Sequence, residues 1–187
     1  GDGHEYSARI VDVAKKRVRL QIASVESPER ELGFTLHIAS ALPKGDRGDF
    51  LIEKLTELGV TDFTPLITER SVVKADDAKA EKLRRAVIES SKQCGRNVLM
   101  RWHPPARWLE WCGKQIGLRL LALPTAIEPI TAKGENAVVA IGPEGGFSES
   151  EIQTALKSGW VGFSLGPRVL RTETAGVVAA TRLGGSH

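Results

Sequence analysis

Ala137-Val-Val-Ala-Ile141 runs directly into Gly142-Pro-Glu-Gly-Gly146, and this junction carries the clearest structural signal in the chain. An uninterrupted apolar run of this kind is typical of a strand that is buried on both faces of a parallel sheet. Ser148 and Glu151 follow at the spacing of a capping box, which marks the start of a helix over residues 149–158. A strand, a glycine turn and a helix in this order predict an α/β unit.

The glycine turn is a candidate ligand site, although a tight connection between a strand and a helix would use the same residues. Glycines let the backbone approach a ligand closely, and parallel α/β sheets bind ligands beyond the carboxyl ends of their strands. The spacing of Gly142, Gly145 and Gly146 matches neither the phosphate-binding P-loop nor the dinucleotide-binding pattern. Glu144 would also repel a phosphate. The turn therefore favours a neutral or cationic ligand.

A second turn follows in Ser164-Leu-Gly-Pro-Arg-Val-Leu-Arg-Thr-Glu-Thr-Ala175. It places a glycine beside Arg168 and Arg171, and it leads into a helix with Thr172 as the expected N-cap and Glu173 in the first turn. Two such turns can enclose one ligand. The alternative is that Arg171 and Glu173 form a solvated ion pair at the start of the helix.

Upstream of these turns, short apolar strands alternate with amphipathic helices from about residue 32. This alternation predicts a mostly parallel α/β sheet. We expect strands over residues 34–39, 61–67, 98–102, 118–123, 137–141 and 162–165, and helices over residues 48–58, 77–94, 106–115, 149–158 and 173–183. Gly59 is placed to end the first helix. The tryptophans lie in apolar surroundings and are expected in the core; they are Trp102, Trp108, Trp111 and Trp160.

The N-terminal segment has a different pattern. Residues 6–13 and 17–25 alternate apolar and polar side chains around the basic turn Ala14-Lys-Lys-Arg17, which is typical of a β-hairpin. A two-stranded hairpin alone is marginally stable in water. We therefore interpret residues 1–31 as part of a small β-domain, truncated at its start, with a linker, and residues 32–187 as a second domain.

Composition indicates an ordinary folded protein, since 41% of the 187 residues are apolar and 26% are charged. A formal net charge of +3 permits RNA binding without requiring it. Cys94 and Cys112 are too few for a zinc site, and the 4 histidines have no metal-ligand spacing. No apolar run reaches the roughly 20 residues that cross a bilayer. We expect a cytoplasmic protein that holds no metal.

Longer motifs add a specific resemblance. Ile141-Gly-Pro-Glu-Gly-Gly-Phe-Ser148, followed by Leu165-Gly166 and Val169-Leu-Arg-Thr-Glu-Thr-Ala175, resembles the RsmE family, whose members methylate N3 of a uridine in 16S ribosomal RNA. The likeness extends upstream, in the same order and spacing, to about residue 41. The upstream matches are Lys54, the run Glu57-Leu-Gly-Val60, Pro65, residues 68–71, Glu89, Gln93 and Arg96.

The resemblance implies a SPOUT-type α/β domain with a mostly parallel sheet and a C-terminal trefoil knot, preceded by a remnant of a PUA-like β-barrel. It also implies a homodimer and S-adenosyl-L-methionine as the cofactor. Carried over by position, the cofactor-binding residues are Leu121, Leu123, Pro124, Ile141, Gly142, Pro143, Gly145, Gly146, Ser164, Leu165, Gly166, Val169 and Leu170. The chain departs from the family pattern at Leu123-Pro124-Thr125, where a glutamate commonly follows the strand.

Methylation of N3 requires removal of the imide proton, because the nitrogen lone pair is delocalised into two flanking carbonyls. We expect Arg171 to stabilise negative charge on a carbonyl oxygen, and Glu144 or Glu173 to accept the proton. The RNA partner is 16S rRNA or the small ribosomal subunit, bound by basic residues through its phosphates. The residues expected to bind it are Arg70, Lys74, Arg85, Lys92 and Arg96, joined by Lys82 and the hairpin turn.

Two other functions remain open from the sequence. The chain could be a SPOUT methyltransferase for another RNA nucleotide, or a non-catalytic RNA-binding adapter that retains the knot. The identity of the methylated nucleoside distinguishes the first alternative, and binding of the cofactor distinguishes the second.

Overall fold

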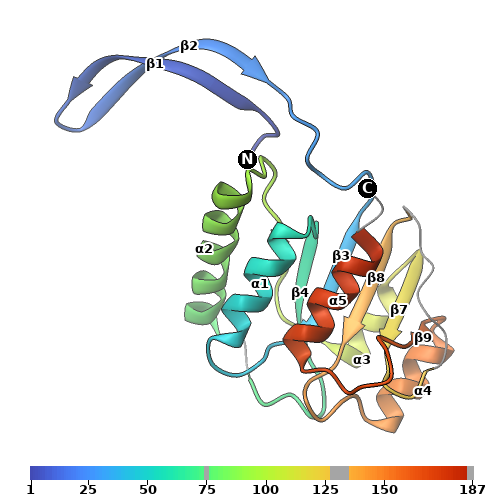
Figure 1. Cartoon of the computed structure of the whole chain (residues 1–187). Coiled ribbons are helices and arrows are strands. Elements are labelled where there is room, and N and C mark those ends of the chain that lie inside the picture. Colours follow the sequence, from blue (N-terminus) through green and yellow to red (C-terminus); the bar gives the residue numbers. More distant parts are fainter. Residues whose placement is uncertain (74–75, 127–134, 185–187) are drawn as a thin grey trace.

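A computed structural model of the protein describes residues 1–73, 76–126 and 135–184 (Figure 1). Within these residues, a seven-stranded sheet has only parallel pairings, in the order β5-β4-β3-β8-β7-β9, with β6 also paired to β4. The strands are β3 (Leu36–Ala41), β4 (Asp62–Ile67), β5 (Arg101–Trp102), β6 (Ala106–Arg107), β7 (Leu118–Ala122), β8 (Ala137–Ile141) and β9 (Val161–Phe163). The predicted α/β sheet is confirmed.

Helices cover both faces of this sheet (Figure 1). One face carries α1 (Arg47–Glu57), α2 (Asp77–Cys94) and α5 (Thr172–Gly184), and the other carries α3 (Trp108–Trp111), the 3-10 turn η1 (Cys112–Lys114) and α4 (Glu149–Lys157). Consecutive residues of a strand pack into the cores on opposite faces of the sheet, because side chains alternate along a strand. Ile38 and Val139 pack under α1 and α5, whereas Ala39 and Ala140 pack on the α4 side. Among the described residues, no helix has the length and apolarity needed to cross a membrane.

The ends of the long helix α2 follow local capping rules. The Asp76 carboxylate accepts a hydrogen bond from the Lys79 amide at 2.8 Å, which satisfies one of the free donors at the helix start. Gly95, with a φ of 78°, adopts the left-handed conformation that ends it. Both predicted bounds of α2 are confirmed for this reason.

The predicted hairpin is formed by β1 (Glu5–Ala14) and β2 (Arg17–Glu26), and it extends away from the sheet (Figure 1). Cross-strand partners share a face, so the pairing register separates two surfaces. The polar face carries Arg9, Asp12, Arg17, Arg19 and Gln21, and the apolar face carries Tyr6, Ile10, Val13, Val18, Leu20, Ile22 and Val25. The larger side chains of the apolar face are all exposed, so the hairpin buries no core of its own.

The linker that follows the hairpin is tied to the sheet domain by Arg96. This buried guanidinium donates to the carbonyls of Thr56 at 2.8 Å and Val60 at 3.0 Å, and it pairs with the Glu31 carboxylate. All of these contacts are internal to the protein. Arg96 was expected on the RNA-binding surface, whereas the structure buries its side chain and gives it these internal partners.

Two predicted elements were wrong in detail. Residues 106–115, predicted as one helix, divide into β6, α3 and η1. Packing overrides the helical pattern there, because the buried indole of Trp160 donates to the Cys112 carbonyl at 3.0 Å. Of the strand predicted over residues 98–102, only β5 forms, and it pairs with the start of β4. The end of β4 pairs with β6 instead. Pro104 and Pro105, which separate the two, lack the amide donors that a continuous strand requires.

Candidate active site

A cavity of about 310 Å³ opens beyond the carboxyl ends of β7 and β8. Three segments enclose it: the turn after β7, the glycine turn after β8, and the segment between β9 and α5. Small-molecule pockets begin at about this volume. Parallel α/β sheets bind ligands beyond the carboxyl ends of their strands, which is where this cavity lies.

Most residues expected at the cofactor line this cavity. They are Leu123, Pro124, Ile141, Gly142, Pro143, Gly145, Gly146, Leu165, Gly166, Val169 and Leu170, together with Glu144. Two expected residues do not line it. Leu121 is fully buried in the core on the α4 side, and the Ser164 hydroxyl accepts a hydrogen bond from the Gly166 amide at 3.1 Å. Leu121 and Ser164 therefore stabilise the segments that enclose the cavity without lining it.

The glycine turn after β8 has a backbone that side chains would disturb. Gly146 has a φ of 68°, a region that favours glycine, and its amide donates to the Pro143 carbonyl at 2.8 Å. A Cβ on Gly142 would lie only 3.1 Å from the Phe147 ring. These glycines thus allow both the tight turn and the close packing beneath it.

Side chains from distant segments hold this turn in place. Arg70, in the loop after β4, donates to the Gly145 carbonyl at 2.7 Å. The Thr172 hydroxyl donates to the Gly142 carbonyl at 3.3 Å. Thr172 was expected to cap α5, but it lies inside the helix, because Ala175 donates to the Arg171 carbonyl at 2.8 Å and so makes Arg171 the capping residue.

Glu151 links the start of α4 to the same loop. Its buried carboxylate accepts hydrogen bonds from the amides of Ser148 at 2.9 Å and Glu69 at 2.8 Å. The predicted capping box is confirmed, and it has a second partner that the sequence spacing does not reveal. The cavity wall is therefore ordered before a ligand binds, which lowers the entropic cost of binding.

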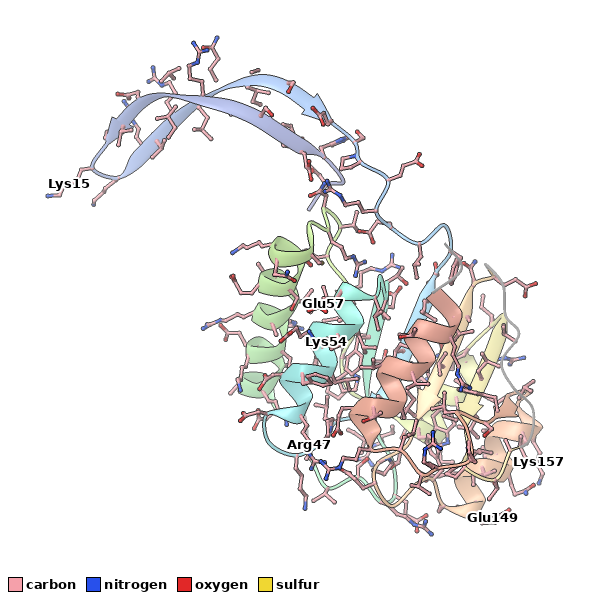
Figure 2. The ribbon with its side chains drawn as sticks, in the orientation of Figure 1. Lys15, Arg47, Lys54, Glu57, Glu149 and Lys157 are labelled. Atoms are coloured by element: carbon pink, nitrogen blue, oxygen red, sulfur yellow. The ribbon has the colours of Figure 1, made fainter. Side chains whose placement is uncertain are left out.

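Arg47 is the first residue of α1 (Figure 2). It lies between two acids near the cavity, Glu144 and Glu173. Its guanidinium lies 3.6 Å from the Glu144 carboxylate and 3.8 Å from that of Glu173. Glu144 lines the cavity and its side chain is 42% exposed, whereas the Glu173 side chain is 8% exposed and does not line it. Within the described ranges no carboxylate pairs with Arg171, so the suggested ion pair between Arg171 and Glu173 is not found.

Arg168 and Arg171 lie on the segment that closes the cavity, and both are exposed. Arg168 lines the cavity, and its neighbour Val169 is 81% exposed. In the part of the chain that the structure describes, neither arginine has a carboxylate partner. The rim of the cavity therefore presents two cations and an apolar side chain to the exterior.

The other basic residues expected at RNA are dispersed. Arg85 and Lys92 are exposed on α2, where each pairs with a glutamate of the same helix, and Lys82 pairs with Asp49 at 2.6 Å. Arg70 is exposed but donates to the glycine turn. Lys74 lies outside the described residues.

A polar cluster lies at the other end of the sheet from the cavity, where β3, β4 and β5 begin. Asp62 accepts hydrogen bonds from Arg101 and lies 2.7 Å from His103, and His37 lies 2.8 Å from the Thr64 hydroxyl. Burial lowers the pKa of His37 to about 4, so this histidine is neutral at pH 7. Burial opposes ionisation of Asp62, but its hydrogen bonds outweigh that effect and hold its pKa at about 2. The polar groups of this cluster bind one another, and His37 is a packed side chain.

In the three described ranges, no group of His, Cys, Asp and Glu side chains is arranged to hold a metal ion. The tryptophans are in or against the core: Trp108 and Trp160 are buried, and Trp102 and Trp111 pack on its edge.

Further residues line the cavity beside those assigned individually to the cofactor. They are Ala122, Thr125, Phe147, Ile152, Arg168, Thr172 and Ala175. Phe147, Arg168, Thr172 and Ala175 lie within the segments quoted from the sequence, and Ala122 and Thr125 adjoin the expected residues Leu123 and Pro124. Arg47 was missed, and nothing in the local sequence marks it, because its partners come from segments far along the chain.

Comparison with known proteins gives one family. The sequence model described as RNA methyltransferase domain matches residues 30–184. The chain is 34% identical over 202 residues to ribosomal RNA small subunit methyltransferase E of Bacillus subtilis, which covers 97% of this chain and 78% of that protein. It is 31% identical over 191 residues to the protein of the same name from Buchnera aphidicola, covering 95% of this chain and 74% of that protein.

Solved structures give the same result. A putative methyltransferase from Legionella pneumophila, described in complex with the cofactor SAM, superposes with a TM-score of 0.91 at 37% identity and covers 100% of this chain and 80% of its own. Ribosomal RNA small subunit methyltransferase E from Neisseria gonorrhoeae, described as bound to S-adenosyl methionine, has a TM-score of 0.89 at 30% identity, with coverages of 99% and 80%.

Proposed function

This chain belongs to the RNA methyltransferase family, and we infer from that membership and from the cavity beyond β7 and β8 that it transfers a methyl group from S-adenosyl-L-methionine to ribosomal RNA. One observation carries this inference. The cavity is enclosed by the same glycine turns that the family resemblance assigns to the cofactor, in a fold whose similar structures are described with that cofactor bound.

The chemistry of the cavity suits this cofactor. Its walls are mainly apolar, with Ile141, Leu165 and Leu170 available to bury an adenine ring. The Glu144 carboxylate is the acid in the lining and would attract a sulfonium cation. When bound, the cofactor supplies an electrophilic methyl group. The chain supplies the enclosure and the charged groups around it.

We propose N3 of a uridine in 16S ribosomal RNA as the methylated atom, as the name of the relatives and the resemblance to the RsmE family both favour. Arg171 is exposed at the cavity rim and is free to donate hydrogen bonds to a base carbonyl as negative charge develops there. Glu144 or Glu173 accepts the imide proton. Arg171, Glu144 and Glu173 therefore form the proposed catalytic group.

The proposed RNA surface centres on the cavity rim. Arg168 would contact the nucleotides next to the target base, and Arg70 lies beside the glycine turn. Arg85 and Lys92 of α2 are exposed at a greater distance and would act through phosphates. The polar face of the hairpin, with Arg9, Arg17 and Arg19, adds positive charge beyond α2.

Three features of architecture are also part of this proposal. A trefoil knot is supported by the path of the chain, because β9 is the edge strand beyond β7, whereas α5 returns to pack on β3 and β8. A PUA-like β-domain that includes residues 1–31 is supported by the exposed apolar face of the hairpin. A homodimer rests on the family resemblance, and analytical ultracentrifugation tests it.

Two measurements test the function. Calorimetry should detect binding of S-adenosyl-L-methionine to the protein. Incubation with small ribosomal subunits that lack the modification, followed by nucleoside mass spectrometry, should give 3-methyluridine in 16S rRNA. A different methylated nucleoside would overturn the uridine assignment. Absence of cofactor binding would overturn the proposal that the protein is a methyltransferase and would favour an RNA-binding adapter.

A further inference from the structure

Arg47, which neither the motifs nor the cavity lining include, connects the two acids of the site. It is the first residue of α1 and lies next to the start of α5 (Figure 2). One side of its guanidinium faces the Glu144 carboxylate at 3.6 Å, and the other faces that of Glu173 at 3.8 Å. Arg47 thus bridges the glycine turn after β8 to the first turn of α5.

Glu173 is the fixed end of this bridge. Its side chain is 8% exposed, and Oε2 is buried with no hydrogen-bond partner among the described residues. A buried carboxylate oxygen without a partner is uncommon in folded proteins and requires an explanation. Arg47 Nη1 lies 3.8 Å from the other oxygen of the same carboxylate, Oε1. Because the guanidinium has five N–H donors, Arg47 is placed to compensate this buried acid.

Glu144 is the accessible end. Its carboxylate lines the cavity and is 42% exposed, so a substrate base can reach it, whereas the buried Oε2 of Glu173 is closed to a base in this conformation. Both of the Arg47 distances exceed hydrogen-bond length. Catalytic contacts are often long in the free enzyme and shorten when the reactants bind.

We propose that Arg47 is a positioning residue which, anchored by the buried Glu173, holds the Glu144 carboxylate at the cavity as the group that takes the proton from the target base. The inference rests on the proposed function. It assigns the roles of the two acids: Glu144 touches the substrate, and Glu173 acts through Arg47.

The reaction balances with these residues. The N3–H bond of the base breaks and its proton passes to a Glu144 oxygen. The electron pair of N3 forms the new bond to the methyl carbon, and the carbon–sulfur bond breaks with its electron pair retained by sulfur. The products are the N3-methylated base and neutral S-adenosylhomocysteine, and the protonated Glu144 returns its proton to water.

Steady-state methylation of 16S rRNA by the full chain tests the role of Arg47. For Arg47→Ala we expect kcat to fall about tenfold to hundredfold, since a positioned general base contributes about 10²–10⁴-fold, while KM for the cofactor stays unchanged. Arg47→Lys keeps a cation and should restore much of the rate. Lys54→Ala is the matched control, because it removes an ion pair from the same helix, with Glu57 at 2.9 Å, and should leave kcat at the wild-type value (Figure 2).

A double-mutant cycle identifies the acid through which Arg47 acts. If Arg47 acts through Glu144, the variant with both Arg47→Ala and Glu144→Gln should be no slower than Glu144→Gln alone. Multiplying effects would overturn the proposal, as would an unchanged kcat or a loss confined to KM for RNA. If the wild type binds no cofactor or makes no 3-methyluridine, the proposed function itself fails, and this outcome is recognised before any variant is measured.

Discussion

The carboxylate of Glu151 accepts a hydrogen bond at 2.8 Å from the backbone amide of Glu69, which lies 82 positions earlier in the chain. The same carboxylate caps α4 through Ser148. The next residue after Glu69 is Arg70, whose side chain donates to Gly145 in the cavity wall. A buried acid that does not reach the cavity therefore supports the residue that holds the glycine turn.

Replacing Glu151 should destabilise the protein in proportion to the acceptors that are lost. Glu151→Ala leaves the buried amide of Ser148 and the partly buried amide of Glu69 without their acceptor. An unsatisfied buried amide costs about 1–3 kcal/mol and a partly exposed one costs less, so we expect the free energy of unfolding to fall by about 1–4 kcal/mol. Glu151→Gln keeps one carbonyl acceptor and should lose less. Urea unfolding measures both variants. Glu149→Ala, an exposed position of the same helix, is the control, and a loss equal to that of the control would refute the role of Glu151.

Gly146→Ala should weaken cofactor binding without a steric clash. A Cβ at this position meets nothing within 4 Å, so the change tests the positive φ alone, which costs about 1–2 kcal/mol for an alanine. We expect the turn to relax and the dissociation constant of the cofactor, measured by calorimetry, to rise about tenfold. Gly117→Ala is the control, because Gly117 has a φ of 78° but precedes β7 at the other end of the strand. Wild-type affinity in Gly146→Ala would contradict the prediction.

Arg96→Ala should unfold far more easily than the wild type. Removing the guanidinium leaves the carbonyls of Thr56 and Val60 and the Glu31 carboxylate without their donor, and breaking a buried pair costs about 3–5 kcal/mol. Thermal unfolding measures the loss. Arg85→Ala, on the surface of α2, should unfold like the wild type but bind RNA more weakly at low salt. The reverse pattern would return Arg96 to the RNA surface.

The stability of the fold should decrease below about pH 6.5 because of His37. Burial, the largest cause, lowers its pKa to about 4, with smaller contributions from His103 and Arg101 and an opposing one from Asp62. As pH falls from about 6.5 to about 4, the unfolded chain binds a proton that the folded chain does not. Stability that is fully present above pH 6.5 is thus lost across this window, by about 2–3 kcal/mol at most.

His37→Gln keeps a side chain that can bond to Thr64 and removes the titration. Urea unfolding at about pH 7 and about pH 5 should therefore show a smaller difference in the variant than in the wild type. Asp62 does not obscure this comparison, because its pKa is held at about 2 and its contribution is lost only below about pH 4. An unchanged pH dependence in His37→Gln would assign the effect to another group.

Local signals in the sequence predicted the elements whose limits are set locally. The bounds of α2 follow from Asp76 and Gly95, and those of β8 follow from its apolar run and the glycine after it. Residues 106–115 were predicted wrongly because Trp108 and Trp160, which meet only in the folded chain, determine that region.

The same distinction separates the site residues. The glycine turns were predicted from the sequence because their backbone requirement is visible in the residue types. The burial of Arg96 was not predicted, because its presence in a motif does not reveal that the side chain packs against Glu31. Arg47 was missed, because its importance depends on Glu144 and Glu173, which are distant in the sequence and meet it only in the fold.

Arg171 should affect the rate of methyl transfer and leave cofactor binding unchanged. It is exposed at the rim but does not line the cavity, so Arg171→Ala should bind the cofactor with wild-type affinity by calorimetry. A donor that stabilises developing negative charge is worth about 10²–10³-fold in rate, so kcat for 16S rRNA should fall by about that factor. Arg171→Lys keeps the charge but loses the bidentate geometry, and it should recover only part of the rate.

Arg168, which precedes Arg171 on the same segment, is the variant to compare with it, because Arg168 does line the cavity. If Arg168 contacts RNA phosphate or the cofactor, Arg168→Ala should raise KM, and for a phosphate contact the effect should shrink as salt is increased. Of these two variants, only Arg171→Ala is expected to lose kcat at saturating cofactor and RNA. If the two variants behave alike, with KM raised and kcat intact, both arginines only bind RNA, and the negative charge on the base must be stabilised by another donor.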